Sequence, residues 1–136
     1  MKIYLDTNVF ADMLIARENR QDNINAMMLL GLVPGSKFEF CISPLTVATC
    51  FYLLRKEKDA AEHIKERLKN MTIVPVAEND VKFSIFFNFP DREDSMHMSC
   101  AVNAGCELIL TRNGAHYKNG PLSAYSPAEF LKIIRR

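Results

Sequence analysis

Two acidic residues, Asp6 and Asp94, have the surroundings expected of carboxylates that bind a cation. Asp6 directly follows a predicted strand at residues 2–5, of which residues 3–5 are apolar, and precedes an amphipathic segment. Asp94 falls in the first turn of a predicted helix that begins near Pro90. In an open parallel α/β sheet, ligands bind at the carboxyl ends of the strands, so a carboxylate there faces a crevice. The two residues therefore point to chemistry at this edge of a sheet.

Hydroxyl and amide side chains follow the same predicted strand ends. Thr7 comes after the first strand and Ser43 after the second. Thr111 and Asn113 come after the fourth. Hard oxygen donors of this kind suit Mg²⁺ or Mn²⁺, and Mg²⁺ commonly uses only one or two carboxylates and keeps several waters. Such an ion polarises a phosphoryl oxygen and lowers the pKa of a bound water.

The elements that must position these side chains alternate along the chain. Strands are expected at residues 2–5, 38–42, 71–76, 107–110 and 122–124. Helices are expected at residues 7–16, 23–32, 44–56, 59–69, 78–87 and 90–105, with a last helix opened by a capping box at Ser126 and Glu129. Alternation predicts an α/β fold in which a central, mostly parallel sheet of about five strands lies between two helical layers. We expect a single domain over residues 1–136. The helix at 44–56 is apolar nearly all round and is predicted to be buried.

Composition narrows the classes of protein. The formal net charge of +1 over 136 residues gives no broad basic face, which argues against a tight, non-specific duplex binder. The four cysteines lack metal-knuckle spacing and are predicted to be buried thiols in a reducing compartment. No apolar run approaches the roughly 20 residues that span a bilayer. The chain opens on a predicted strand rather than a signal peptide, so a cytoplasmic location is expected.

Five short motifs, in this order and spacing, resemble the PIN domain family, and within it the VapC-type ribonuclease toxins and their relatives. They are Asp6-Thr7-Asn8, Ile42-Ser43-Pro44, Asp91-Arg92-Glu93-Asp94, Leu110-Thr111-Arg112-Asn113 and Ser126-Pro127-Ala128-Glu129-Phe130-Leu131. The resemblance implies a three-layer PIN-like fold and an endoribonuclease that uses Mg²⁺ or Mn²⁺. It implies that Asp6 and Asp94 are catalytic metal-binding residues, that Thr7 or Asn8 orients the first carboxylate, and that Thr111 supports the site. A toxin of this kind would have RNA as substrate and an antitoxin protein as partner, and it could form a homodimer.

The chain departs from the family pattern where further acidic residues are common. The family often has an acidic residue in the helix after the second strand, where the likeliest match in this chain is Thr49. It often has Asp after the Thr-Arg pair, where this chain has Asn113. A further acidic residue is often found a few positions later in the family, where this chain has Ala115-His116. Asp91 or Glu93 could substitute, since both lie within a turn of Asp94.

Several residues keep two interpretations. Asp6 and Asp91 could cap helices, and Glu93 could be a surface carboxylate. Arg112 and Lys118 flank the site loop and could bind RNA phosphates, although Arg112 could instead form a structural salt bridge. His97, one helical turn after Asp94, could be a site histidine, although a packed or surface role is expected.

The function likewise keeps an alternative. With fewer charges at its site, the chain could be a catalytically weakened or inactive PIN-like domain that binds RNA or protein. A phosphatase or receiver-type domain is disfavoured, because position 8 is Asn rather than a second Asp.

Overall fold

Strand β1 (Lys2–Leu5) lies at the centre of a five-stranded sheet in the computed structural model, which describes residues 1–17, 19–35, 37–86 and 89–135. The strand order is β3-β2-β1-β4-β5, and every neighbouring pair is parallel. The other strands are β2 (Glu39–Ile42), β3 (Thr72–Ile73), β4 (Leu108–Leu110) and β5 (Ser123–Tyr125). Because the chain moves outward from β1 to β3 and then crosses to β4, the order reverses beside β1. Such a switch point opens a crevice at the carboxyl ends of β1 and β4.

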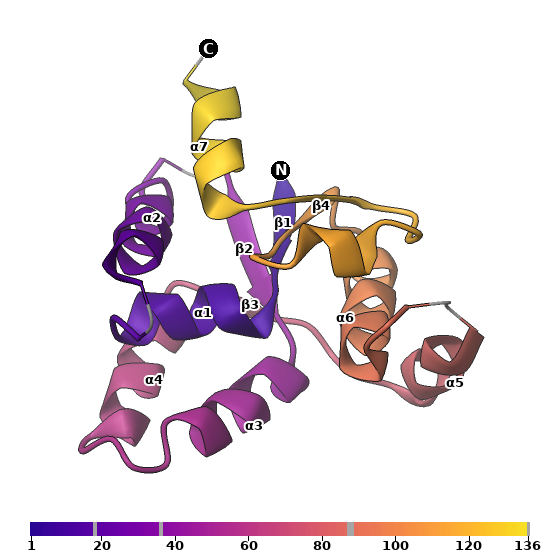
Figure 1. The fold of residues 1–136 in the computed structure, drawn as a ribbon, viewed down its shortest axis with the longest axis horizontal. Helices are drawn as coiled ribbons and strands as arrows, with labels where there is room; N and C mark the ends of the chain where they lie inside the picture. The colour runs from indigo at the N-terminus through magenta and orange to yellow at the C-terminus, as the bar shows by residue number, and fades with distance from the viewer. Residues whose placement is uncertain (18, 36, 87–88, 136) are drawn as a thin grey trace.

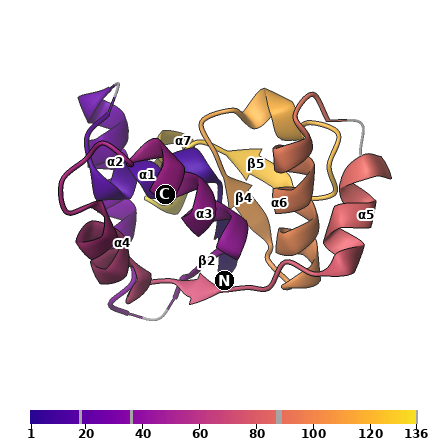
Figure 2. The same cartoon turned by 90° about the horizontal axis from the view of Figure 1, so that it is seen from below.

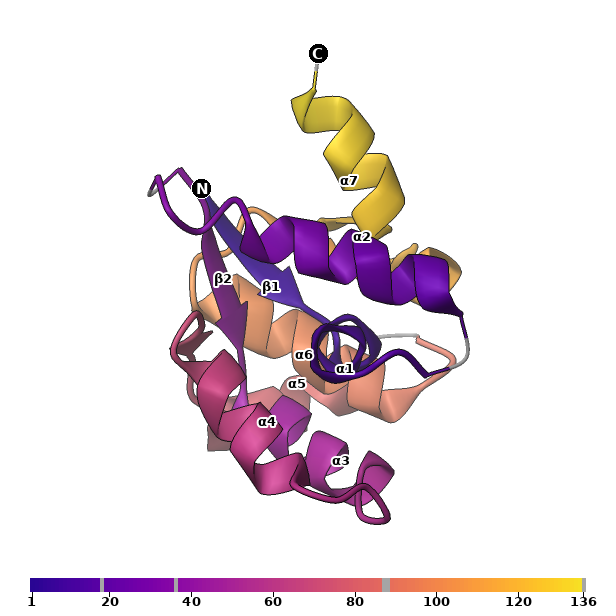
Figure 3. The ribbon, with the colours of Figure 1, turned by 90° about the vertical axis from the view of Figure 1, so that its left-hand side faces the viewer.

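Helices cover both faces of this sheet. On one side lie α1 (Thr7–Leu14), α2 (Arg20–Leu30), α3 (Pro44–Leu53) and α4 (Ala60–Leu68), and on the other lie α5 (Glu78–Phe86) and α6 (Arg92–Asn103), as Figure 2 shows. A 3₁₀ turn, η1 (Gly114–Tyr117), joins the α6 side. The final helix α7 (Pro127–Ile134) packs into the α1 side and rises above α2 (Figure 3). The predicted three-layer α/β/α fold is confirmed.

Alternation along β1 divides the core between the two faces. Ile3 and Leu5 pack into the cluster under α1, whereas Tyr4 points into the cluster under α6. Successive side chains of a strand point to opposite faces, so a buried central strand must be apolar on both. Figure 1 shows β1 running directly into α1, which leaves Asp6 at the junction.

Most element boundaries differ from the sequence prediction by one to three residues, and three of the differences are instructive. Helix α1 ends at Leu14 rather than residue 16. Helix α2 starts at Arg20 rather than residue 23, because the Asn19 side chain accepts a hydrogen bond from the backbone N–H of Gln21 at 2.8 Å and caps the helix. Strand β3 spans only two residues of the predicted 71–76, since Pro75 has no N–H to continue the ladder. The predicted end of α5 at residue 87 lies outside the described residues.

The predicted burial of the helix at 44–56 is wrong. Phe51, Tyr52 and Leu53 in the last turn of α3 are 49%, 64% and 39% exposed. This helix packs against α1 and α4 at the periphery, so its outer surface meets solvent despite its apolar sequence. The four cysteines, in contrast, are buried and free, as predicted.

Within the described part of the chain, we find no helix with the length and apolar character that crossing a membrane requires.

Candidate active site

Asp6 is held between the ends of β1 and β4 by two short hydrogen bonds. Its Oδ1 accepts from the backbone N–H of Thr7 at 2.7 Å, and its Oδ2 accepts from the hydroxyl of Thr111 at 2.7 Å. The side chain is 5% exposed. The predicted capping of α1 by Asp6 is confirmed. Each carboxylate oxygen can accept more than one bond, so capping leaves Asp6 able to bind a cation as well.

The loop after β4 is built around Thr111. This side chain is fully buried, and its hydroxyl also accepts a hydrogen bond from the backbone N–H of Asn113 at 3.0 Å. Asn8 contacts the same loop, because its Oδ1 accepts from the backbone N–H of Arg112 at 3.4 Å. The Thr7 backbone therefore orients Asp6, while Asn8 contacts the loop instead. Residue Asn113 itself is exposed.

Asp94 enters the crevice from the first turn of α6. Asp91 caps that helix, as predicted, by accepting from the backbone N–H groups of Glu93 and Asp94 at 2.7 and 3.4 Å. Tyr117 donates to Asp94 Oδ1 at 3.2 Å, and His116 Nδ1 lies 2.9 Å from Asp94 Oδ2. Burial and the neighbouring charge of Asp6 raise the pKa of the Asp94 carboxyl. The two carboxylates are thus close enough to repel each other.

Glu93 brings a third carboxylate to the border of the crevice. The hydroxyl of Thr49 on α3 donates to its Oε1 at 3.1 Å, so the neutral residue on α3 contacts an acid supplied by α6. Glu93 is half-buried, and His97, followed by the hydroxyls of Thr49 and Thr7, lowers the pKa of its carboxyl despite that burial. Glu93 is therefore ionised at neutral pH.

His97 links the elements around the crevice. Its side chain is fully buried, with Nδ1 2.6 Å from Tyr4 Oη and Nε2 3.0 Å from Thr7 Oγ1. The same Nε2 lies 3.7 Å from Asp6 Oδ1 and 3.6 Å from Glu93 Oε1. The expected packed role is correct, but its partners are site residues.

Ser43 lies at the far end of this chain of polar contacts. Tyr4 Oη donates to Ser43 Oγ at 2.9 Å, and Ser43 is fully buried at the start of α3. Burial, the largest cause, raises the pKa of the Tyr4 phenol, which keeps it neutral. Ser43 thus supports Tyr4 and His97, and through them the site.

The sequence prediction omitted Tyr4 and Tyr117 from the site, placed His116 in a nearby loop without a role, and preferred a packed or surface role for His97 over a site role. His97 had a signal, because it lies one helical turn after Asp94 and so faces the same way. His116 and Tyr117 follow a strand end, but their loop conformation decides where they point. Nothing in the sequence pointed to Tyr4, since an aromatic residue in a central strand is expected to be part of the hydrophobic core.

Arg112 pairs with two carboxylates beside the crevice. Its Nε lies 3.0 Å from Asp12 Oδ2 and its Nη1 lies 3.1 Å from Asp22 Oδ2. These residues line a cavity of about 360 Å³ together with Asn113 and the start of α7. The alternative of a structural salt bridge is therefore present. Lys118, at the end of η1, is exposed.

Asp6 and Asp94 fit a single divalent cation that keeps most of its water. Their mutual repulsion in a buried crevice is the electrostatic condition that a cation relieves. Across residues 1–17, 19–35, 37–86 and 89–135, no three Asp, Glu, His or Cys side chains are arranged as ligands of one ion. A Mg²⁺-type site with one or two carboxylates and several waters matches this donor set, whereas an all-protein cage does not.

Comparison with known proteins gives the family of the chain. The sequence profile described as PIN domain matches residues 2–115. No curated protein sequence matches the chain. Among solved structures, VapBC2 from Rickettsia felis bound to a promoter DNA fragment is similar with a TM-score of 0.69 and 16% identity, over 93% of this chain and 98% of that one.

Two further solved structures share the fold at similarly low identity. A toxin–antitoxin complex from Klebsiella pneumoniae gives a TM-score of 0.71 at 16% identity, covering 92% of this chain and 97% of that chain. The sarcin-ricin loop cleaving toxin VapC20 from Mycobacterium tuberculosis gives 0.63 at 14% identity, covering 79% and 86%. Because the profile spans most of the sequence and these structures share its fold, the chain belongs to the PIN domain family.

Proposed function

We propose that the chain is a metal-dependent endoribonuclease that hydrolyses RNA phosphodiester bonds. The observation that carries the proposal is the pair of buried carboxylates, Asp6 and Asp94, at the switch point of the sheet, where burial and the charge of Asp6 raise the pKa of Asp94. Mg²⁺ or Mn²⁺ is the cofactor that this pair fits. Membership of the PIN family supports the assignment, and VapC20, a toxin of similar fold, cleaves the sarcin-ricin loop.

Each residue of the site has a proposed role. Asp6 and Asp94 hold the ion, which supplies polarisation of a phosphoryl oxygen and activation of water. Thr111 and the Thr7 backbone fix Asp6, while Tyr117 fixes Asp94. The contacts of His97 with Tyr4 and Thr7 hold α6 against β1 and the start of α1 across the crevice.

RNA would approach along the loop after β4. Lys118 is exposed at the end of η1 and is free to meet a phosphate. Arg112 is already paired with Asp12 and Asp22, so it is a weaker candidate for binding a phosphate. Asn113, exposed beside Arg112, offers an amide to the same ligand.

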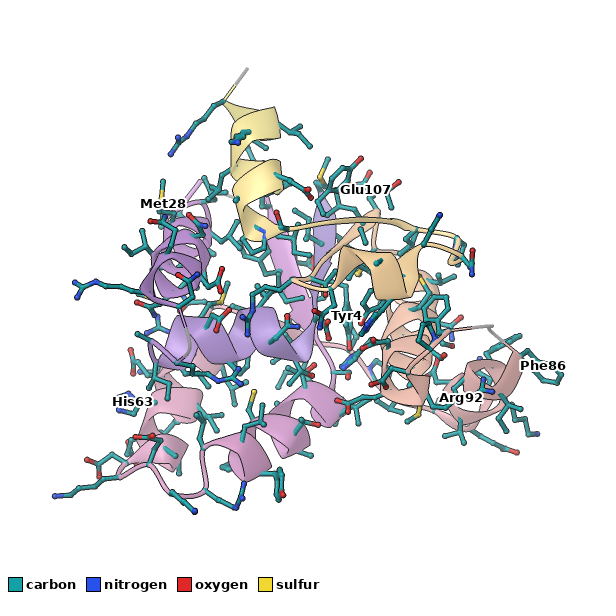
Figure 4. All side chains as sticks on the ribbon, in the orientation of Figure 1. Tyr4, Met28, His63, Phe86, Arg92 and Glu107 are labelled. Carbon is teal, nitrogen blue, oxygen red and sulfur yellow. The ribbon has the colours of Figure 1, made fainter. Side chains whose placement is uncertain are left out.

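The partner we propose is an antitoxin protein that covers the crevice. The similar structures from Rickettsia felis and Klebsiella pneumoniae are toxin–antitoxin assemblies, which supports this assignment. Such an enzyme would act in the cytoplasm, and its four reduced thiols fit that compartment. Pairing of two copies would use α2, where Met27 and Met28 are 40% and 39% exposed and Met28 points outward (Figure 4).

The alternative is a PIN-like domain that binds RNA or protein without cutting. The neutral Thr49 and Asn113 favour it, because each would supply a charge if it were acidic. Glu93 offsets the first of these losses, since its carboxylate contacts Thr49 at the border of the site.

A cleavage assay separates the two functions. Purified chain is incubated with mixed-sequence RNA and Mn²⁺, beside Asp6→Asn and Asp94→Asn variants and a Glu107→Gln control on the surface far from the crevice (Figure 4). We expect cleavage by the wild type and the control but not by the site variants. Absence of cleavage together with absence of Mn²⁺ binding by calorimetry would overturn the proposal. Cleavage that survives both site substitutions would show a contaminating nuclease.

A further inference from the structure

His116 is placed at the mouth of the crevice as a nitrogen donor beside Asp94. Its Nδ1 lies 2.9 Å from Asp94 Oδ2. The Asp94 side chain is 12% exposed and that of His116 is 41% exposed, so the pair spans the boundary between the buried site and solvent. A cation arriving from solvent therefore meets the imidazole and the carboxylate together.

The turn that carries His116 is held firmly. The adjacent Tyr117 is 1% exposed, donates to the other oxygen of Asp94, and packs edge-to-face on Phe89 with ring centroids 5.6 Å apart. Gly120 closes the turn so tightly that an added Cβ would lie 2.8 Å from Phe89 Cζ and against Met98. The imidazole is thus delivered to Asp94 by a fixed backbone.

The spacing of the two atoms matches neighbouring ligands of one ion. Adjacent ligands of an octahedral cation at about 2.1 Å are roughly 3 Å apart. The observed 2.9 Å between His116 Nδ1 and Asp94 Oδ2 equals that edge, so an ion can replace the hydrogen bond without moving either side chain far.

We propose that His116 Nδ1 and Asp94 Oδ2 bind the divalent cation together, and that the site therefore selects a first-row transition-metal ion such as Mn²⁺ over Mg²⁺. Mg²⁺ prefers oxygen ligands throughout, whereas affinity for nitrogen donors rises along the transition series. The inference rests on the proposed function only for the location of the site. The added nitrogen ligand decides between Mg²⁺ and Mn²⁺, a choice that the two carboxylates alone leave open.

The other side chains near the ion have different roles. Asp6 holds the ion together with Asp94, as proposed above, and contributes its negative charge. His97 is not the nitrogen donor, because it is fully buried and both ring nitrogens are occupied by Tyr4 and Thr7.

Metal binding without RNA tests the inference. Calorimetry measures Kd for Mn²⁺ and for Mg²⁺ with the wild type, His116→Gln and His116→Asp. The control is His63→Gln, on the exposed α4 far from Tyr4 and the crevice (Figure 4). We expect wild type and control to bind Mn²⁺ at least tenfold more tightly than Mg²⁺. His116→Gln should weaken Mn²⁺ binding by about tenfold or more and Mg²⁺ binding by less than threefold. His116→Asp should replace the nitrogen donor by an oxygen donor, so that the affinities for Mn²⁺ and Mg²⁺ become similar.

Pulsed electron paramagnetic resonance of bound Mn²⁺ gives a second readout. Directly coordinated ¹⁴N should modulate the echo in the wild type and in His63→Gln but not in His116→Gln. A wild type without ¹⁴N coupling, or with coupling that persists in His116→Gln, would overturn the inference while leaving the ribonuclease proposal intact. Nitrogen-coupled Mn²⁺ in a chain that cuts no RNA would support the inference and overturn the ribonuclease proposal. A wild type that binds neither ion would overturn both.

Discussion

The hydrogen bond from Thr111 to Asp6 offers a direct measure of how strongly the fold holds its candidate site. Thr111→Val preserves the side-chain shape but removes the hydroxyl that donates to Asp6 Oδ2 at 2.7 Å. It also removes the acceptor of the Asn113 backbone N–H. Because Asp6 is 5% exposed and Thr111 is fully buried, water cannot easily replace the lost donor.

The magnitude follows from the charge on the acceptor. A hydrogen bond to an ionised group contributes about 1.5–3 kcal/mol, and removing one partner leaves the other with its desolvation cost. We expect Thr111→Val to lower the free energy of unfolding by about 2–3 kcal/mol. For 136 residues this corresponds to a fall in Tm of roughly 7–10 °C.

Urea unfolding in chelator provides the assay, with Thr111→Ser as the matched control that keeps the hydroxyl. A double-mutant cycle with Asp6→Ala isolates the pair, and we expect a coupling energy of at least about 1.5 kcal/mol. If Thr111→Val unfolds within about 0.5 kcal/mol of the wild type, or if the coupling is near zero, the bond does not hold Asp6 as described.

Three further perturbations test the surrounding structure. Burial and the charge of Asp6 raise the pKa of Asp94, so its ionised form costs stability once the pH exceeds about 4, the ordinary value of an unfolded Asp. Asp94→Asn should therefore be more stable than the wild type in chelator at pH 7, with the gain vanishing toward pH 3 in parallel urea titrations; an unchanged difference across that range would contradict the repulsion. Asp91→Ala should remove the cap of α6 and lower stability by about 1 kcal/mol, while Asp91→Ser should retain it, as judged by thermal unfolding. Asp80→Ala should lower the free energy of unfolding by about 3 kcal/mol yet leave Mn²⁺ affinity unchanged, and a loss of affinity would place it in the site. The bonds that this last change removes come from Ser99 Oγ at 2.6 Å, Asn103 Nδ2 at 2.7 Å and Ala77 N at 2.8 Å.

Local patterns determined much of the fold. Apolar runs bounded by polar residues predicted the strands, and Asp91 and the Ser126–Glu129 box announced two helix starts that the structure contains. These signals work because capping and strand alternation depend on residues close in the sequence. Boundaries at α2 and β3 failed where a single cap or a single proline decided the end.

The burial of α3 shows the limit of such patterns. Its sequence is apolar nearly all round, yet its last turn is exposed, because burial depends on which neighbours a helix has rather than on its own composition. Nothing local to residues 44–53 specifies which elements will cover them, or that the last turn will be left exposed.

The candidate site divides in the same way. The sequence by itself predicted Asp6 and Asp94 as candidates, since a carboxylate after a strand and another in the first turn of a helix are local features. Only the tertiary structure joined Thr49 to Glu93, buried His97 between Tyr4 and Thr7, and set His116 beside Asp94. Those contacts cross between elements far apart in the chain, so they depend on the parallel order of the strands and the conformation of the loop after β4. Side-chain chemistry is written in the sequence, but which side chains share one crevice is decided by packing.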